Sequence, residues 1–110
     1  MFREDYFDFI YIDGSHYYED IVEEIRLSKK LAKKSFSILC GDDYEMLHNA
    51  ELMEFARMHP NRDFIYHPSG VYFHPGVMLA IHEELGEVNM ENGFWWIFCC
   101  DGDWTKTKSD

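Results

Sequence analysis

The sequence predicts an α/β fold in which two parallel strands are joined by a crossover helix. Residues 7–12 and 35–40 are short apolar runs, and each ends in a turn rich in aspartate and glycine. Residues 17–33, between them, carry apolar side chains at helical spacing. Strand, helix and strand make a βαβ unit, whose crossover is right-handed in about 98% of cases. We therefore expect residues 1–110 to form one α/β domain.

Aromatic and β-branched residues dominate the first run, which stops at Asp13. A near-continuous apolar run is typical of a strand covered on both faces, so we expect residues 7–12 to be buried on both sides. Ser15 is the expected N-cap of the following helix, with Glu19 and Asp20 in its first turn. Lysines crowd the end of that helix, where they oppose the negative end of its dipole.

The second half of the chain predicts shorter elements. A final buried strand is expected at 94–100, FWWIFCC, after the tight-turn dipeptide Asn92-Gly93. Polar residues 101–110 are expected to form a frayed tail. The remaining expectations are a helix at 49–58, a loose hairpin from 63–66 and 71–73, a helix at 77–85 and a strand at 87–90.

Charge and cysteine content exclude several classes of protein. The net charge is −11, with 21 acidic and 10 basic residues, so a nucleic-acid partner is not expected. No apolar run is long enough for a membrane span. Cys40, Cys99 and Cys100 lie in apolar runs without metal-ligand spacing, which favours buried thiols in a reducing, cytoplasmic setting.

Three aspartates form the leading candidate site. Asp13 follows the first strand, and Asp42 and Asp43 follow the second. The carboxyl ends of neighbouring parallel strands meet at one edge, where α/β proteins bind ligands. Carboxylate oxygens suit a hard divalent cation such as Mg²⁺. The alternative is turn chemistry alone, because Asp-Gly and Gly-Asp are common turn dipeptides.

His16 lies at the mouth of the same turn as Asp13. It could contact a cofactor or carry a proton, and it could equally be a solvated residue at a helix start. The other histidines are scattered without ligand spacing and are expected on the surface or in loops: His48, His59, His67, His74 and His82.

The segment ILCGDDYEML also resembles the catalytic hairpin of viral RNA polymerases, in which an aspartate pair binds two magnesium ions. Such a fragment should be basic and should continue as an antiparallel strand. This chain is acidic and continues toward a helix, so the polymerase interpretation is disfavoured.

Four motifs occur in one order: FDFIYIDGSHYYEDIVEEI, ILCGDDYE, HPGVMLAIHEELGEV and NGFWWIF. In this order the chain resembles the C-terminal half of a class I S-adenosylmethionine-dependent methyltransferase, similar to catechol and macrocin O-methyltransferases. The resemblance implies a partial Rossmann-like sheet with parallel strands, a crossover helix and an antiparallel C-terminal strand pair. It also implies metal-assisted methyl transfer to an oxygen of a small-molecule acceptor.

The resemblance assigns roles to residues of this chain. Asp13, Asp42 and Asp43 match the aspartates that bind magnesium in metal-dependent members. The segment Asp13, Gly14, Ser15 and His16 matches the one that approaches S-adenosylmethionine, and Asp13 and His16 are the expected catalytic residues.

The chain also departs from the family pattern. No glycine-rich GxGxxG-like loop is present, so the N-terminal cofactor-binding half is lacking. Lys33-Lys34-Ser35 stands where a Gly-Gly turn is usual. We expect the isolated chain to be inactive and to self-associate or pair through the exposed edge of its first strand. The alternative is a non-catalytic remnant that serves as an oligomerisation or binding module.

Overall fold

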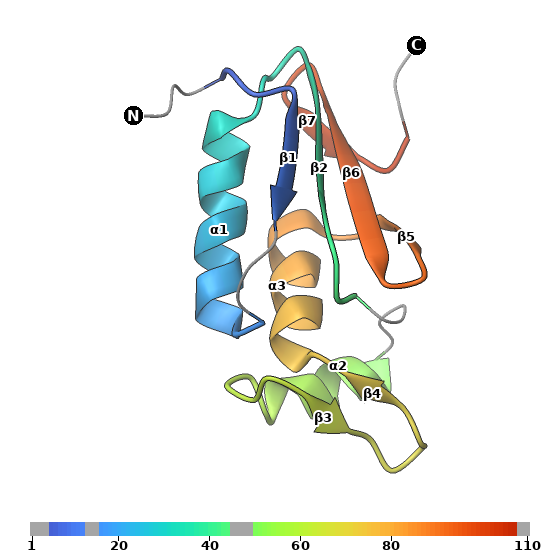
Figure 1. Cartoon of the computed structure of the whole chain (residues 1–110). Helices are drawn as coiled ribbons and strands as arrows, with labels where there is room; N and C mark the ends of the chain where they lie inside the picture. The colour runs from blue at the N-terminus through green and yellow to red at the C-terminus, as the bar shows by residue number, and fades with distance from the viewer. Residues whose placement is uncertain (1–4, 13–15, 45–49, 108–110) are drawn as a thin grey trace.

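The computed structural model describes residues 5–12, 16–44 and 50–107 of the chain. It has a mixed β-sheet with helices on one side and a smaller layer at one end (Figure 1). The helices are α1 (Tyr18–Leu31), α2 (Ala50–Arg57) and α3 (Pro75–Leu85). The strands are β1 (Phe9–Ile12), β2 (Phe36–Gly41), β3 (Ile65–Tyr66), β4 (Tyr72–Phe73), β5 (Asn89–Glu91), β6 (Phe94–Cys100) and β7 (Asp103–Thr105).

The main sheet has the order β1-β2-β6-β5, with β7 also paired to β6. Strands β1 and β2 are parallel, and Ile12 lies opposite Gly41 at their carboxyl ends. Strand β6 runs antiparallel to β2, and β5 runs antiparallel to β6. The predicted α/β class, with a parallel pair joined by a helix and an antiparallel C-terminal pair, is therefore confirmed at this level.

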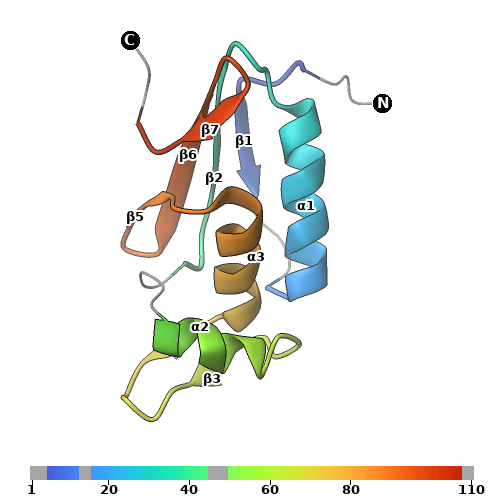
Figure 2. The same ribbon diagram turned by 180° about the vertical axis from the view of Figure 1, so that it is seen from behind.

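Helices α1 and α3 cover one face of the sheet, and Figure 2 shows them in front of it. Their apolar sides meet alternate residues of the central strands, including Leu39 on β2 and Ile97 on β6, which are 0% and 1% exposed. Ile25 of α1 and Ile81 of α3 are fully buried in the same cluster. This face holds the main hydrophobic core.

The opposite face of the sheet is open in the described part of the chain. Phe9 and Tyr11 of β1 are 57% and 41% exposed, so the prediction of a strand buried on both faces was wrong. The reason is that α1 and α3 lie on the same face, and that β1 is the edge strand of the described sheet. An apolar run therefore did not distinguish burial on two faces from burial on one.

A shallow groove of about 400 Å³ crosses this open face, lined by Phe9, Ile38, Cys40, Glu91, Phe94, Trp96 and Phe98.

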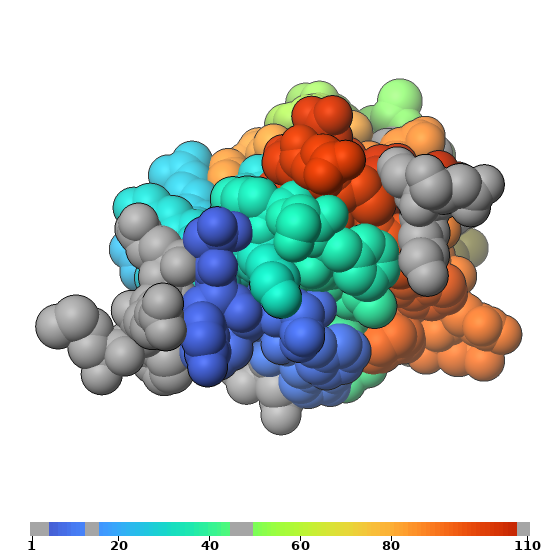
Figure 3. Space-filling view, turned by 90° about the horizontal axis from the view of Figure 1, so that it is seen from above, coloured from blue at the N-terminus to red at the C-terminus, as the bar shows by residue number. Residues whose placement is uncertain are grey.

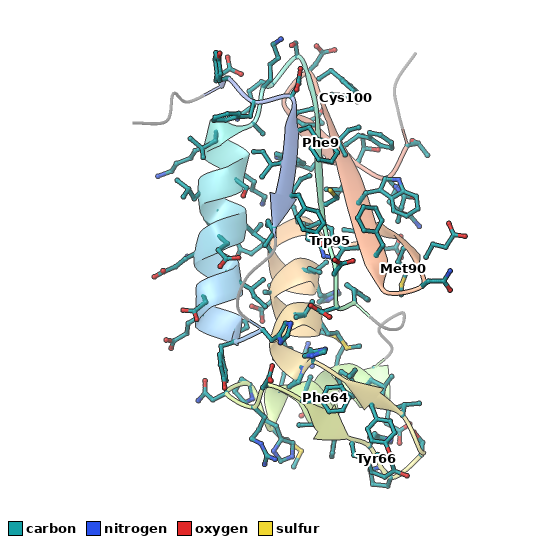
Figure 4. The ribbon with its side chains drawn as sticks, viewed as in Figure 1. Phe9, Phe64, Tyr66, Met90, Trp95 and Cys100 are labelled. Carbon is teal, nitrogen blue, oxygen red and sulfur yellow. The ribbon has the colours of Figure 1, made fainter. Side chains whose placement is uncertain are left out.

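A second layer lies beyond the carboxyl ends of β1 and β2. Strands β3 and β4 form the predicted hairpin, in which Ile65 pairs with Phe73. This layer has its own core, in which Phe73 and Leu79 are buried together with residues of α2. Figure 4 shows Phe64 and Tyr66 in this layer, below Trp95 of β6. The layer forms one wall at the carboxyl edge of the sheet.

The start of α1 differs from the prediction. Tyr17, not Ser15, occupies the N-cap position, and its side chain makes no capping hydrogen bond. Ser15 itself lies outside the described residues. The predicted signal failed because the chain does not enter the helix until Tyr18.

The C-terminal segment also differs from the prediction of a frayed tail at 101–110. Asp101 and Gly102 form a turn with φ values of 51° and 87°, and β7 then pairs antiparallel with β6. The amide of Gly102 donates to the carbonyl of Lys34 at 2.9 Å, so the turn packs on the α1–β2 connection. Figure 3 shows this turn beside that connection. Residues 108–110 lie outside the described part.

The three thiols are buried and unpaired with one another, as expected for Cys40, Cys99 and Cys100. Among the described residues, the helices lack the length and apolar content needed to cross a membrane.

Candidate functional site

The carboxyl ends of β1 and β2 lie side by side, as the parallel pairing predicted. Gly41 makes their close approach possible, because a Cβ at this position would lie 2.8 Å from Nε1 of Trp95 and 3.0 Å from the carbonyl oxygen of Ile12. The first contact is shorter than real Cβ atoms show, and the second is tighter than most of them. A side chain at position 41 would therefore disturb the end of β2, directly before Asp42 and Asp43.

Asp42 and Asp43 have different partners. The hydroxyl of Tyr11, on β1, donates to the carboxylate of Asp42. Asp43 has a φ of 69°, a left-handed conformation that aspartate tolerates better than most residues. Its Oδ2 accepts a hydrogen bond from Nε2 of His16 at 2.7 Å. The structure therefore brings His16 and Asp43 together. Asp13, Gly14 and Ser15, the remaining predicted site residues, lie outside the described residues.

His16 lies between two carboxylates. Its Nε2 faces Asp43 and its Nδ1 lies 2.8 Å from Oδ1 of Asp63. Ionised carboxylates only accept hydrogen bonds, so both contacts are satisfied at once only when both ring nitrogens carry protons. Partial burial lowers the pKa of His16, but the hydrogen bonds to Asp43 and Asp63 outweigh it and leave this pKa above its ordinary value. The two carboxylates therefore favour the imidazolium form of His16 over its neutral form.

His74 joins this group from the start of α3. It occupies the N-cap position of that helix, and its ring centroid lies 4.2 Å from that of His16. Phe64 contacts the His74 ring edge to face at 5.0 Å. His74 was expected on the surface or in a loop, and it lies half-buried in the connection before α3, but its contact with His16 was not predicted.

Gly76 explains how α3 reaches His16. A Cβ on Gly76 would lie 2.5 Å from the carbonyl oxygen of His16 and 2.6 Å from the backbone nitrogen of Tyr18. The first turn of α3 therefore lies directly against the backbone that leads into α1. This backbone contact places His16 and His74 side by side without requiring any sequence spacing between them.

The resulting cluster consists of His16, Asp63 and His74. Each offers a ligand atom, and these atoms lie within 4.8 Å of one another. Asp63 is 51% exposed at its side chain and His16 is 32% exposed, so the cluster is open to solvent on one side. Sequence reasoning singled out His16 but missed the cluster, because Asp63 and His74 come from two other segments of the chain.

His67, which was expected on the surface or in a loop, lies in the turn between β3 and β4. Its ring is buried within this turn, with 7% exposure, and its Nδ1 accepts from the backbone amide of Ser69 at 3.1 Å. The ring also meets Phe55 edge to face at 4.8 Å. This histidine stabilises the β3–β4 turn and lies apart from the His16 cluster.

An aromatic groove of about 440 Å³ adjoins the cluster. Phe64 lines this groove and also contacts His74. Arg62 supplies its positive charge, and the lining is otherwise mostly aromatic. The lining residues are Phe55, His59, Arg62, Phe64, Ile65, Tyr66 and Tyr72. Such a surface suits a flat, partly anionic small molecule.

Comparison of the chain with family models, with curated proteins and with solved structures found no match. Its function is therefore inferred from its own residues and geometry.

Proposed function

We propose that this chain forms the acceptor-binding half of an S-adenosylmethionine-dependent methyltransferase domain. The observation that supports the proposal is the parallel β1–β2 pair: Asp42 and Asp43 directly follow β2, and Asp43 is hydrogen-bonded to His16. Four sequence motifs in the order expected of such enzymes support it. The reaction would be methyl transfer to an oxygen of a small-molecule acceptor.

The free edge of β1 supports the same proposal. In the common doubly wound order 3-2-1-4-5-6, the fourth strand pairs with the first, whose turn carries the glycine-rich phosphate- or cofactor-binding loop. Strand β1 corresponds to the fourth strand, and in the described sheet its far side has no partner strand. A complementary half would add its first strand there and would supply most contacts to the methyl donor.

Each residue has a defined part in this proposal. Asp42 and Asp43 offer carboxylate oxygens, a donor set that fits a hard cation, and Asp13 is expected to complete it. A divalent cation such as Mg²⁺ would act as a Lewis acid and orient the acceptor hydroxyl. His16, in its neutral form, would accept the proton that the acceptor oxygen releases as it bonds to the methyl carbon.

The aromatic groove beside Phe64 is the proposed acceptor site. A planar phenolic acceptor would stack on its aromatic wall, and Arg62 would favour an anionic substituent. Phe64 lines the groove and contacts His74, whose ring lies beside that of His16. An acceptor in the groove would therefore lie close to His16.

Thermal melts with and without millimolar Mg²⁺ test the metal part of this proposal. The cation should stabilise the parent chain, by about 2.7 kcal/mol at a hundredfold excess over its dissociation constant. It should not stabilise Asp42→Asn/Asp43→Asn. The matched control is Asp101→Asn/Asp103→Asn, which removes the same charge at the far end of β6. Equal shifts in both double variants would mean that Mg²⁺ acts only on the general negative charge.

A methyl-transfer assay tests the reaction itself. The genomic reading frame upstream should encode a glycine-rich βαβ segment, and the longer chain should transfer labelled methyl groups from S-adenosylmethionine to a panel of catechols and other phenols. His16→Gln should abolish most of the transfer. A stop codon directly upstream, with no complementary half encoded nearby, would contradict the enzyme and favour the alternative below.

The alternative function is a non-catalytic binding module, and the open apolar face of the sheet favours it. A partner covering Phe9 and Phe98 would bury side chains that the described structure leaves accessible. Chemical modification of Asp42 and Asp43 would then leave partner binding unchanged.

A further inference from the structure

His16, Asp63 and His74 form a second potential metal centre, distinct from the three aspartates at the strand ends. Their ligand atoms lie within 4.8 Å of one another. They come from three places in the fold: the segment before α1, the segment before β3 and the N-cap of α3. This convergence is a property of the fold and cannot be read from local spacing.

The donor set selects a class of metal. Two imidazoles and one carboxylate suit Zn²⁺, Co²⁺, Ni²⁺ or Fe²⁺, whereas Mg²⁺ prefers oxygen ligands alone. Zinc sites with three protein ligands are typically tetrahedral, with the fourth position left for water or a substrate atom. The 51% exposure of the Asp63 side chain leaves the cluster open to solvent for such a position.

The second nitrogen of His16 supplies an independent argument. Metal-bound histidines almost always donate their other ring N–H to a carboxylate, a carbonyl or water, which fixes the tautomer and the ring orientation. Nε2 of His16 already makes this contact with Oδ2 of Asp43 at 2.7 Å. Nδ1, which faces Asp63 at 2.8 Å, is then the nitrogen directed at the cluster.

The cluster is also preorganised by backbone packing. The close fit of Gly76 against the carbonyl of His16 fixes the two histidine-bearing segments relative to each other. Phe64 supports the His74 ring from the side at 5.0 Å. Only Asp63 sits on an irregular, exposed segment, and it can adjust.

Little movement is needed to admit an ion. Bonds of about 2.0–2.1 Å in a tetrahedral site place neighbouring ligand atoms about 3.3 Å apart. Nδ1 of His16 and Oδ1 of Asp63 are now 2.8 Å apart, joined by a hydrogen bond. An ion would take the place of that proton and separate the two atoms by about half an ångström. His74 would also have to move toward the ion, because the ligand atoms of the cluster lie up to 4.8 Å apart.

We propose that His16, Asp63 and His74 bind one divalent transition-metal ion of the zinc type, with Asp43 as the outer partner of His16. The site does not depend on the proposed methyl transfer, because Asp63 and His74 have no part in it. The two uses of His16 exclude each other, since a metal on Nδ1 prevents the ring from accepting a proton there. A bound zinc ion would therefore oppose methyl transfer by the complete domain.

Calorimetric titration of the full chain with Zn²⁺ is the direct test. The parent should bind one ion, and Asp63→Asn and His74→Gln should each lose this binding. Asp43→Asn, which removes only the outer contact, should weaken the affinity by about 10–100-fold. His59→Gln is the matched control, because His59 lies outside the cluster, and it should bind like the parent.

The variants also separate this site from a general effect of charge. Circular dichroism should show that Asp63→Asn folds, since its side chain is 51% exposed. Asp42→Asn should leave zinc binding intact, and His74→Gln should leave the Mg²⁺ stabilisation intact. With Co²⁺ as the probe, the parent should show the strong visible absorption of a tetrahedral ion. Zinc binding retained in both Asp63→Asn and His74→Gln, or an absence of binding by the folded parent, would overturn the proposal.

Discussion

Ile38 and Leu39 are neighbours on β2, yet their surroundings are opposite. Leu39 faces α1 and α3 and is fully buried, whereas Ile38 lines the shallow groove on the open face. Both residues are aliphatic and similar in size. The difference shows that the hydrophobicity of a residue alone does not predict which face of this sheet packs against the helices.

The open face is nevertheless organised. Phe36 and Phe98 stack with ring centroids 6.0 Å apart, and Phe94 and Trp96 stack at 5.8 Å. The Phe36–Phe98 contact joins β2 to β6 and so stabilises neighbouring strands, whereas the Phe94–Trp96 contact lies along β6 itself. The face therefore contributes to the sheet while presenting apolar surface outward, as a docking surface would.

The largest expected effect separates the two faces directly. Leu39→Ala should destabilise the chain by about 2–5 kcal/mol, because it removes buried methyl groups and leaves a cavity. Ile38→Ala should cost clearly less, since Ile38 is only partly buried. Chemical denaturation of both variants measures the contrast. Equal losses would mean that something covers the open face in solution.

A smaller effect is expected where α3 meets the start of α1. Gly76→Ala places a methyl group within 2.5–2.6 Å of backbone atoms, which cannot move aside as a side chain could. Overpacking of this kind costs about 1–3 kcal/mol. Thermal unfolding measures it. Unchanged stability would show that the contact between α3 and the His16 backbone is looser than described.

The open face itself gives the next prediction. Phe98→Thr keeps a strand-forming residue but removes apolar surface and the stacking contact with Phe36, so the stability of the monomer should fall by about 0.2–1 kcal/mol. If copies of the chain associate through this face and the β1 edge, the variant should shift sedimentation toward monomer. Thr105→Ser on β7 is a conservative control at the residue paired with Phe98. If the parent chain is a monomer at all concentrations, it does not self-associate through the open face.

The smallest effect concerns the ion pair that joins the two covering helices. Arg26 Nε donates to Glu84 Oε1 at 3.0 Å and Arg26 Nη2 donates to Glu84 Oε2 at 3.1 Å. The hydrogen bond from Arg26 is the main reason that the pKa of Glu84 lies below its ordinary value of 4.5. A lowered carboxyl pKa gives stability above the ordinary pKa and loses it as the pH falls through the folded value.

Arg26→Gln should therefore lower the melting temperature slightly near neutral pH, and the difference from the parent should vanish in acid. Melts from pH 7 down to pH 3 check this. Arg57→Gln, which removes an exposed pair within α2, is the control and should show a weaker pH dependence. A difference that grows in acid would contradict the assigned direction of the Glu84 pKa.

Elements marked by strong local signals were predictable from the sequence. The strand at 94–100 matches β6 because Asn92-Gly93 fixes its start and its apolar run has no interruption. The helices α1 and α3 follow from apolar periodicity and from Gly86, which ends α3 with a φ of 75°. These signals are local, so they survive without knowledge of the tertiary structure.

What could not be predicted depends on long-range packing. Strand β7 was missed although Asp101-Gly102 is a recognised hairpin dipeptide, because the polar residues after it resembled a tail. The His16 cluster was missed because Asp63 lies 47 positions away and meets His16 only through the fold. The exposure of β1 depends on which face of the sheet the helices cover, and the residues of β1 do not determine that face.

The order of the strands also governs when the molecule can fold during synthesis. Strand β6 pairs with β2 and contributes Trp95 and Ile97 to the main core, yet it begins only at Phe94. Ribosomes add about 5–20 residues per second, so β6 is synthesised on the order of seconds after β2. During that time, the edge of β2 that pairs with β6 has no partner strand. Until then, two parallel strands and a helix expose an aggregation-prone edge. A nascent chain stalled before Phe94 should depend on chaperones, whereas one released after β6 should not.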